Sequence, residues 1–118
     1  MADSSVLLPA SPLVLVLTTF PEAEQARQIG TALIERQLAA CVNFVPSIQS
    51  VYRWQGQIQQ DAEIIALFKT RRALLPGLEA ALSALHPYAT PEFVVLAAES
   101  ASSAYLAWVE ATTAQPQA

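Results

Sequence analysis

The chain has 118 residues, of which 53% are hydrophobic and only 14% charged, with a formal net charge of −4. This length is typical of a single domain, and a domain of this size folds without disulfides or a structural metal. Soluble proteins average about 25% charged residues, so a lone copy of this chain would expose unusually much apolar surface. We therefore expect a homo-oligomer.

Charge and hydropathy exclude several classes of function. The six Lys and Arg residues form no basic stripe for phosphates, so we expect no nucleic-acid partner. Apolar runs such as 13–17 are far shorter than the roughly 20 residues of a membrane-spanning helix, so we expect no membrane insertion. A secretory signal begins with basic residues, but the first basic residue of this chain is Arg27. Cys41 is the single cysteine, so the chain forms no internal disulfide. Both features favour the cytoplasm.

The first half of the chain predicts a strand, a helix and one long hairpin. Residues 1–12 are expected to form a flexible tail, and the apolar, β-branched run 13–18 a strand covered on both faces. Apolar residues at helical spacing predict a helix over 21–37. Alternation then predicts hairpin arms at 41–54 and 58–70. Arms of this length should project from the core and pair with a neighbouring subunit.

Two details of the hairpin follow from its residue types. Pro46 cannot donate to a strand ladder and predicts a bulge or an edge position, and Gln55-Gly56 predicts a tight turn. The second half predicts a helix over 72–85, a proline-stiffened loop over 86–91 and a buried strand over 93–97. Ser102 is suited to cap a last helix.

This order of elements predicts an α+β fold, a ferredoxin-like βαββαβ sandwich with an antiparallel sheet, a long hairpin and an extra C-terminal helix. We expect a single domain over 13–113 and a C-terminal tail over 114–118. Three glycines exclude a glycine-rich phosphate loop and a nucleophile elbow.

Four residues are candidate metal ligands. His86 can satisfy carbonyls at a helix end or bind a ligand, but one histidine cannot alone form a two-histidine zinc site. A metal would need help from Cys41, Glu63, Glu92 or another subunit. If Cys41 does not bind a metal, we expect it to be a small buried apolar residue. If Glu92 does not bind a metal, we expect it to pair with Lys69 or with a backbone amide. Glu63 shares a strand face with Asp61, where two carboxylates bind a hard cation or are simply solvated.

The aromatic residues Tyr52 and Trp54 near the hairpin tip make either subunit contacts or a flat surface for a planar ligand. With Lys69 and Tyr88 they are candidates for the floor of a ligand cleft.

Several motifs together resemble one known family, the CutA divalent-cation tolerance proteins. The resemblance covers 13–112 and rests on Ala39-Ala40-Cys41-Val42-Asn43, the hairpin from Pro46 to Gly56, Lys69-Thr70, His86-Pro87-Tyr88 and Pro91-Glu92. It implies a ferredoxin-like fold, a homotrimer whose hairpins pair between subunits, and cytoplasmic tolerance of copper and other divalent metals. It places a metal at His86, and less securely at Glu92 and Cys41.

One departure from the family bears on the metal. Some bacterial members have a second cysteine where this chain has Thr18, which removes a soft ligand for Cu(I). The implied trimer also resembles nitrogen-regulatory signalling trimers, which hold small ligands between subunits.

Three functional hypotheses follow. The first is a non-enzymatic trimer, without an obligatory cofactor, that weakly binds a divalent metal such as Cu²⁺ or Zn²⁺ at intersubunit clefts through His86 with Glu92 or Glu63. The second is a regulatory module whose clefts bind a small anionic metabolite or nucleotide. The third is an enzyme with His86 and Glu92 as acid and base.

Overall fold

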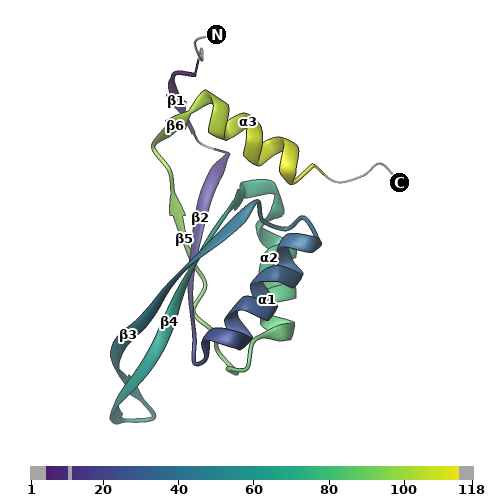
Figure 1. Ribbon diagram of the computed structural model, residues 1–118. Helices are drawn as coiled ribbons and strands as arrows, with labels where there is room; N and C mark the ends of the chain where they lie inside the picture. Colours follow the sequence, from purple (N-terminus) through teal and green to yellow (C-terminus); the bar gives the residue numbers. More distant parts are fainter. Residues whose placement is uncertain (1–4, 11, 115–118) are drawn as a thin grey trace.

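The computed structural model describes residues 5–10 and 12–114. Its main sheet contains four antiparallel strands in the order β3-β4-β2-β5. The strands are β2 (Leu13–Phe20), β3 (Cys41–Trp54), β4 (Gln57–Arg71) and β5 (Val94–Ala97). Helices α1 (Ala23–Glu35) and α2 (Leu75–Leu85) lie side by side on one face of this sheet (Figure 1), and the short 3-10 helix η1 (Arg72–Leu74) precedes α2.

This arrangement is a ferredoxin-like fold, as the sequence predicts. Strands and helices alternate as β2-α1-β3-β4-α2-β5, and both β4 and β5 pair with the central strand β2. The predicted bounds of the helices and of the hairpin arms agree with the structure to within about two or three residues. The fold class predicted from the sequence is therefore confirmed.

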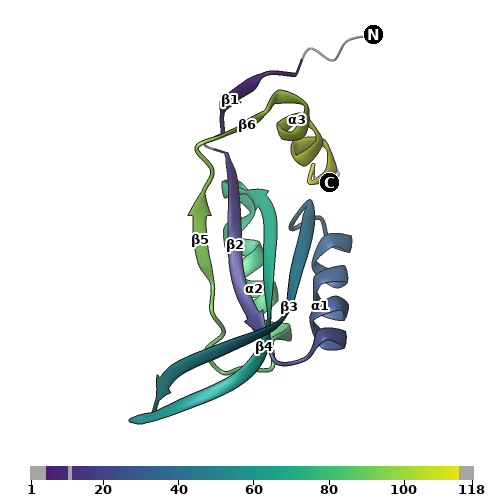
Figure 2. The ribbon, with the colours of Figure 1, turned by 60° about the vertical axis from the view of Figure 1, so that its left-hand side comes forward.

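The core lies between the sheet and the two helices. The strands contribute every second residue to it, since successive side chains point to opposite faces, and the helices contribute residues at helical spacing. Its buried members are Val16, Phe20, Ala26, Ile29, Leu33, Ala39, Ala66, Phe68, Leu78, Ala81 and Leu82. No helix in the described part of the chain covers the opposite face of the sheet (Figure 2).

The strand predicted to be buried over 93–97 is instead an exposed edge strand in the single chain. Val94, Val95 and Leu96 are 44%, 39% and 43% exposed. The prediction was wrong because, among residues 5–10 and 12–114, β5 pairs only with β2 and no strand lies on its outer side. An apolar run thus marks a surface of the single chain, in line with the excess of apolar residues in the composition.

The β3-β4 hairpin extends beyond the rest of the domain (Figure 2). Its register shifts by one residue between Val45 and Ile48, where Pro46 predicts a bulge. The turn residues Gln55 and Gly56 both have positive φ, 50° and 77°, which matches the twist of a two-residue hairpin turn. The projection explains why the radius of gyration is 15.9 Å, against about 13.5 Å for a compact domain of this length.

A small second sheet joins the two ends of the domain. Strand β1 (Leu7–Pro9) lies within the range predicted as a flexible tail, and it pairs with β6 (Ser100–Ser102). Helix α3 (Ser103–Thr112) follows, and the Ser102 Oγ accepts a hydrogen bond of 3.2 Å from the Tyr105 amide, so the predicted cap is confirmed. Residues 1–4 and 115–118 of the predicted tails lie outside the described residues.

Candidate functional site

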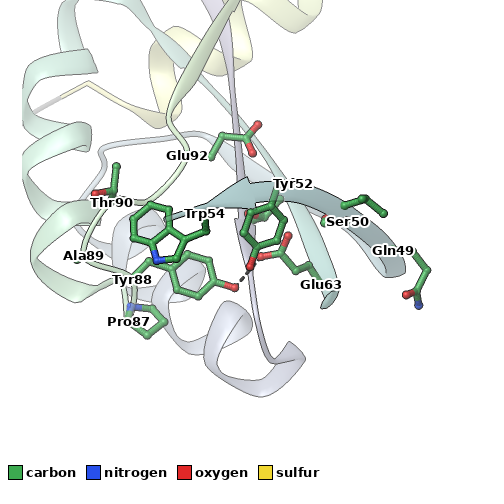
Figure 3. Close-up of a pocket in the computed structure, with 12 residues that line it drawn as sticks. Gln49, Ser50, Tyr52, Trp54, Glu63, Pro87, Tyr88, Ala89, Thr90 and Glu92 are labelled. Carbon is green, nitrogen blue, oxygen red and sulfur yellow. Dashed lines mark hydrogen bonds between the residues drawn. The ribbon is translucent and has the colours of Figure 1, made fainter. Parts of the chain in front are cut away.

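A cleft of about 860 Å³ lies between the hairpin and the loop that follows α2 (Figure 3). The bulge in β3 determines which side chains enter it. Beyond the bulge, Ile48 pairs with Glu63 and Tyr52 with Gln59, so the even-numbered residues of β3 share a face with Glu63. The lining residues are Thr19, Gln49, Ser50, Val51, Tyr52, Trp54, Glu63, Pro87, Tyr88, Ala89, Thr90 and Glu92.

Glu63 is the most deeply placed acid of the cleft. Its side chain is only 8% exposed, and its Oε2 accepts a hydrogen bond of 2.6 Å from the Tyr88 hydroxyl (Figure 3). Burial raises the pKa of Tyr88 far above its usual value, and the hydrogen bond to Glu63 raises it further. The phenol therefore stays protonated and remains a donor to the carboxylate.

Glu92 provides a second carboxylate at the same cleft. Its pKa is raised, first by burial and then by the negative charge of Glu63. None of the twelve lining residues is Lys, Arg or His, and the only ion pair among the described residues joins Arg27 to Glu24 on α1. The cleft is therefore a region of negative charge that a bound cation would stabilise.

His86 lies behind the wall of the cleft rather than inside it. The imidazole is 7% exposed and stacks on Phe20 with ring centroids 4.6 Å apart. Its Nδ1 accepts a hydrogen bond of 3.0 Å from the Tyr88 amide, which can only donate. The ring proton therefore sits on Nε2, which donates to the Thr19 carbonyl at 2.7 Å. Both ring nitrogens have protein partners, so neither offers a lone pair to a metal.

Burial lowers the pKa of His86, although the hydrogen bond to Thr19 and the charge of Glu63 oppose this shift. The neutral imidazole is thus the form that the fold favours. In this form His86 fixes Thr19 and Tyr88, two residues that line the cleft. The geometry therefore supports a positioning role, which differs from the expected bond to carbonyls at a helix end because the ring bonds to the Thr19 carbonyl on β2 instead.

Cys41 lies far from the other predicted metal ligands. It pairs with Lys69, six residues along β4 from Glu63, which corresponds to roughly 20 Å at about 3.3 Å per residue. Its Sγ is 3.6 Å from the Tyr105 hydroxyl. Burial, together with this contact, raises the pKa of Tyr105 to about 12.

Lys69, predicted to floor the cleft, lies at the same distant end of the sheet and donates to the Asn43 side chain. Tyr52, Trp54 and Tyr88 do line the cleft, and the Tyr52 hydroxyl donates to Asp61. The structure thus brings together three of the four residues predicted for the ligand cleft, and two of the four predicted metal ligands, Glu63 and Glu92.

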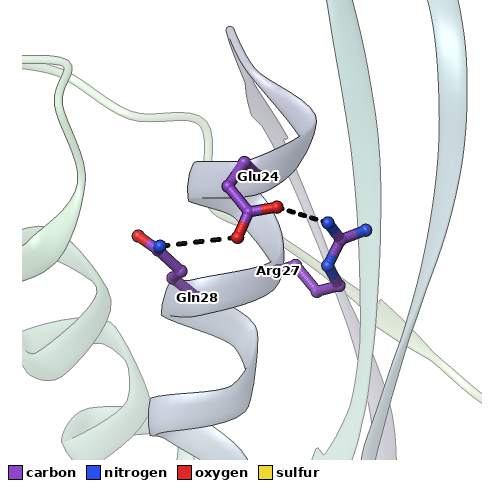
Figure 4. A network of polar contacts seen from close by, with 3 residues as sticks. All are labelled: Glu24, Arg27 and Gln28. Atoms are coloured by element: carbon purple, nitrogen blue, oxygen red, sulfur yellow. Dashed lines mark hydrogen bonds and ion pairs between the residues drawn. The ribbon is translucent and has the colours of Figure 1, made fainter.

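The described residues contain no group of three or more His, Cys, Asp or Glu side chains that could hold a metal ion. A second, smaller hollow lies on α1. The Glu24 carboxylate there accepts from Arg27 and from the Gln28 amide (Figure 4). Because Glu24 and Arg27 already pair with each other, which leaves Glu35 as the one other charged lining residue, we do not consider it a candidate site. Sequence reasoning missed Thr19, Gln49, Ser50 and Val51 of the cleft, and no spacing signal marks them.

The comparisons with known proteins identify the family of the chain. The family model of the CutA1 divalent ion tolerance protein matches residues 14–112. The chain belongs to this family. The divalent-cation tolerance protein CutA of Thermus thermophilus is 46% identical over 99 residues, which cover 84% of this chain and 96% of that protein. Protein CutA of Mus musculus is 37% identical over 112 residues, 95% of this chain but only 63% of the mouse protein.

Solved structures of the family share the fold closely. CutA from Synechococcus elongatus superposes with a TM-score of 0.89 at 40% identity, covering 92% of this chain and 96% of that one. A protein described as the periplasmic divalent cation tolerance protein CutA from Archaeoglobus fulgidus gives a TM-score of 0.83 at 32% identity, covering 86% and 98%. Within the described residues, no helix has the length and apolar character needed to span a membrane.

Proposed function

We propose that this chain is a homotrimeric, cytoplasmic divalent-cation tolerance protein that binds divalent metal ions weakly at clefts between its subunits and catalyses no reaction. The observation that carries the proposal is the buried Glu63 carboxylate at the cleft. It accepts a hydrogen bond from the Tyr88 phenol, it forms no ion pair with a basic side chain of the described residues, and its negative charge helps to raise the pKa of the nearby Glu92.

Oxygen donors replace the imidazole in this proposal. Because both nitrogens of His86 are engaged and Cys41 is distant, Glu63 and Glu92 are the ligands that the geometry favours. Two carboxylates leave most coordination positions to water or to a neighbouring subunit, so we expect weak binding. Among divalent ions, Cu²⁺ should bind more tightly than Zn²⁺ by the general affinity order.

Uncovered apolar surface supports the trimer. The exposed residues include members of the edge strand and of the projecting hairpin, where Leu96 is 43%, Val51 65% and Ile58 59% exposed. Contiguous apolar surface of this kind is normally buried by another chain. The prediction is that sedimentation reports a particle of three times 12.7 kDa. A stable monomer at micromolar concentration would contradict it.

The other two hypotheses receive less support. An anionic metabolite would enter a cleft whose lining contains two carboxylates and no basic residue. An acid–base pair of His86 and Glu92 is disfavoured because His86 does not line the cleft, and both its nitrogens are bonded elsewhere.

Calorimetric titration of Cu²⁺ into the full chain at pH 7 tests the proposal. Glu63→Gln keeps the shape and the acceptor for Tyr88 but removes the charge, and we expect it to weaken Cu²⁺ binding by about tenfold. Glu92→Gln should also weaken binding, whereas Glu79→Gln, at an exposed position on α2, is the matched control. Unchanged isotherms for both cleft variants would refute the proposed site.

A further inference from the structure

Aromatic side chains form a large part of the cleft, and a bare metal ion does not need them. Tyr52 and Trp54 from the hairpin and Tyr88 from the loop line the same cleft as Glu63 and Glu92, and the Tyr52 and Tyr88 rings lie next to Glu63 (Figure 3). Within the described residues, neither Tyr52 nor Trp54 stacks on another ring. Trp54 is 51% exposed. Open aromatic faces beside acids are the combination that binds organic cations, because the ring face attracts positive charge.

The size of the cleft also favours an organic cation over a bare metal ion. A metal ion with six waters occupies roughly 200 Å³, at about 30 Å³ for each water. The cleft holds about 860 Å³, within the range of about 300–1,000 Å³ that is usual for small-molecule sites. A ligand that uses the whole space therefore has an organic body as well as a charge.

The hydrogen-bonding capacity of Glu63 indicates which cationic group a ligand of the cleft would carry. A carboxylate accepts about four hydrogen bonds, and the Tyr88 hydroxyl supplies one to Oε2. A primary ammonium group has three N–H donors for the acceptor positions that remain and for Glu92. Its apolar or aromatic body would lie against the Tyr52 and Trp54 rings.

We propose that the cleft between the hairpin and the loop after α2 binds a small organic cation, a primary amine carried on a flat apolar or aromatic body. The ammonium group is bound by Glu63 and Glu92, and the body contacts Trp54 and Tyr52. This inference rests on the cation-binding cleft of the proposed function and adds a second class of cation to it.

The test uses calorimetry on the full chain with 2-phenylethylammonium as the probe. The neutral 2-phenylethanol and the anion 3-phenylpropanoate serve as ligand controls. We expect the ammonium compound to bind at least tenfold more tightly than either control, since only it carries the charge that the carboxylates attract. Equal binding of the ammonium and the alcohol would overturn the inference.

Protein variants locate the site. Trp54→Leu should weaken the amine about fivefold or more, whereas Trp108→Leu, the same change at a 45% exposed tryptophan on α3, should leave the affinity unchanged. Trp54→Phe keeps an aromatic face and should retain most of the affinity, which controls for any effect of the leucine on assembly. Equal losses in the Trp54 and Trp108 leucine variants would refute the site.

The same variants separate this inference from the metal proposal. Trp54→Leu should weaken binding of the amine more than binding of Cu²⁺, because the indole is not a metal ligand, while Glu63→Gln should weaken binding of both ligands. Amine binding that depends on Trp54, in a chain that does not bind Cu²⁺, would support the inference and refute metal binding at this cleft. Metal binding without amine binding would refute the inference alone.

Discussion

Replacing His86 by alanine tests whether this histidine supports the fold or binds the metal. The imidazole joins the loop after α2 to the end of β2, since it stacks on Phe20, donates to the Thr19 carbonyl and accepts from the Tyr88 amide. We expect His86→Ala to lower the free energy of unfolding by about 3 kcal/mol. Roughly 1 kcal/mol comes from each hydrogen bond and roughly 1 kcal/mol from the lost ring burial.

The pH dependence of stability gives the same test a distinctive signature. Burial holds the pKa of folded His86 below the value of 6.5 for the free side chain. As the pH falls through about 6.5, the unfolded chain therefore takes up a proton that the folded chain does not. This difference favours unfolding, so stability falls with decreasing pH until the folded pKa is reached. His86→Ala should lack this component.

Urea unfolding of both proteins at pH 8, 7, 6 and 5 measures both effects. The chain concentration must be the same throughout, because the stability of an oligomer depends on it. Subtracting the two pH profiles cancels the contributions of other groups, including Glu63 and Glu92. A stability loss below 1 kcal/mol, or parallel profiles between pH 8 and pH 5, would refute the structural role. Loss of Cu²⁺ binding in a variant that remains fully stable would identify His86 as a ligand instead.

Three further substitutions test particular contacts. Gly30→Ala should cost about 1–3 kcal/mol of stability in urea, because its Cβ would lie only 3.0 Å from the Phe44 Cζ; no measurable cost would contradict this packing. Ser102→Ala removes the side-chain acceptor at the start of α3 and should cost about 1 kcal/mol, whereas Ser102→Asn should be nearly neutral in the same assay. Tyr88→Phe removes the hydroxyl that donates a hydrogen bond to the buried Glu63 carboxylate and should cost about 1–3 kcal/mol of stability in urea at pH 7; unchanged stability would contradict this hydrogen bond.

Local residue types made most of the fold predictable. Pro46 indicated the bulge, Gln55-Gly56 the turn and Ser102 the cap, because each of these residues restricts the backbone or supplies a hydrogen bond within a few positions. The exposure of β5 was not predictable from its composition. An apolar strand looks the same whether its own chain or a second copy covers it.

The cleft was only partly predictable, because it depends on a shift of register. Before the bulge, Val45 pairs with Ile65, and after it Ile48 pairs with Glu63. One extra residue thus changes which side chains of β3 face Glu63. The sequence indicates that Pro46 interrupts the strand, but it does not give the size of the shift. The contact between Glu63 and Tyr88, 25 residues apart, follows from this shift and from tertiary packing.

The β1-β6 pair affects where the chain can safely be shortened. A protein that begins at Leu13, where the apolar pattern of the main sheet starts, would lack the three residues that pair with β6 and also the fully buried Ala10. The backbone of β6 would lose its partners, and the pocket around Val109 would open to solvent. Protease digestion should therefore release α3 from the shortened protein sooner than from the complete chain, even though the removed segment lies far from α3 in sequence.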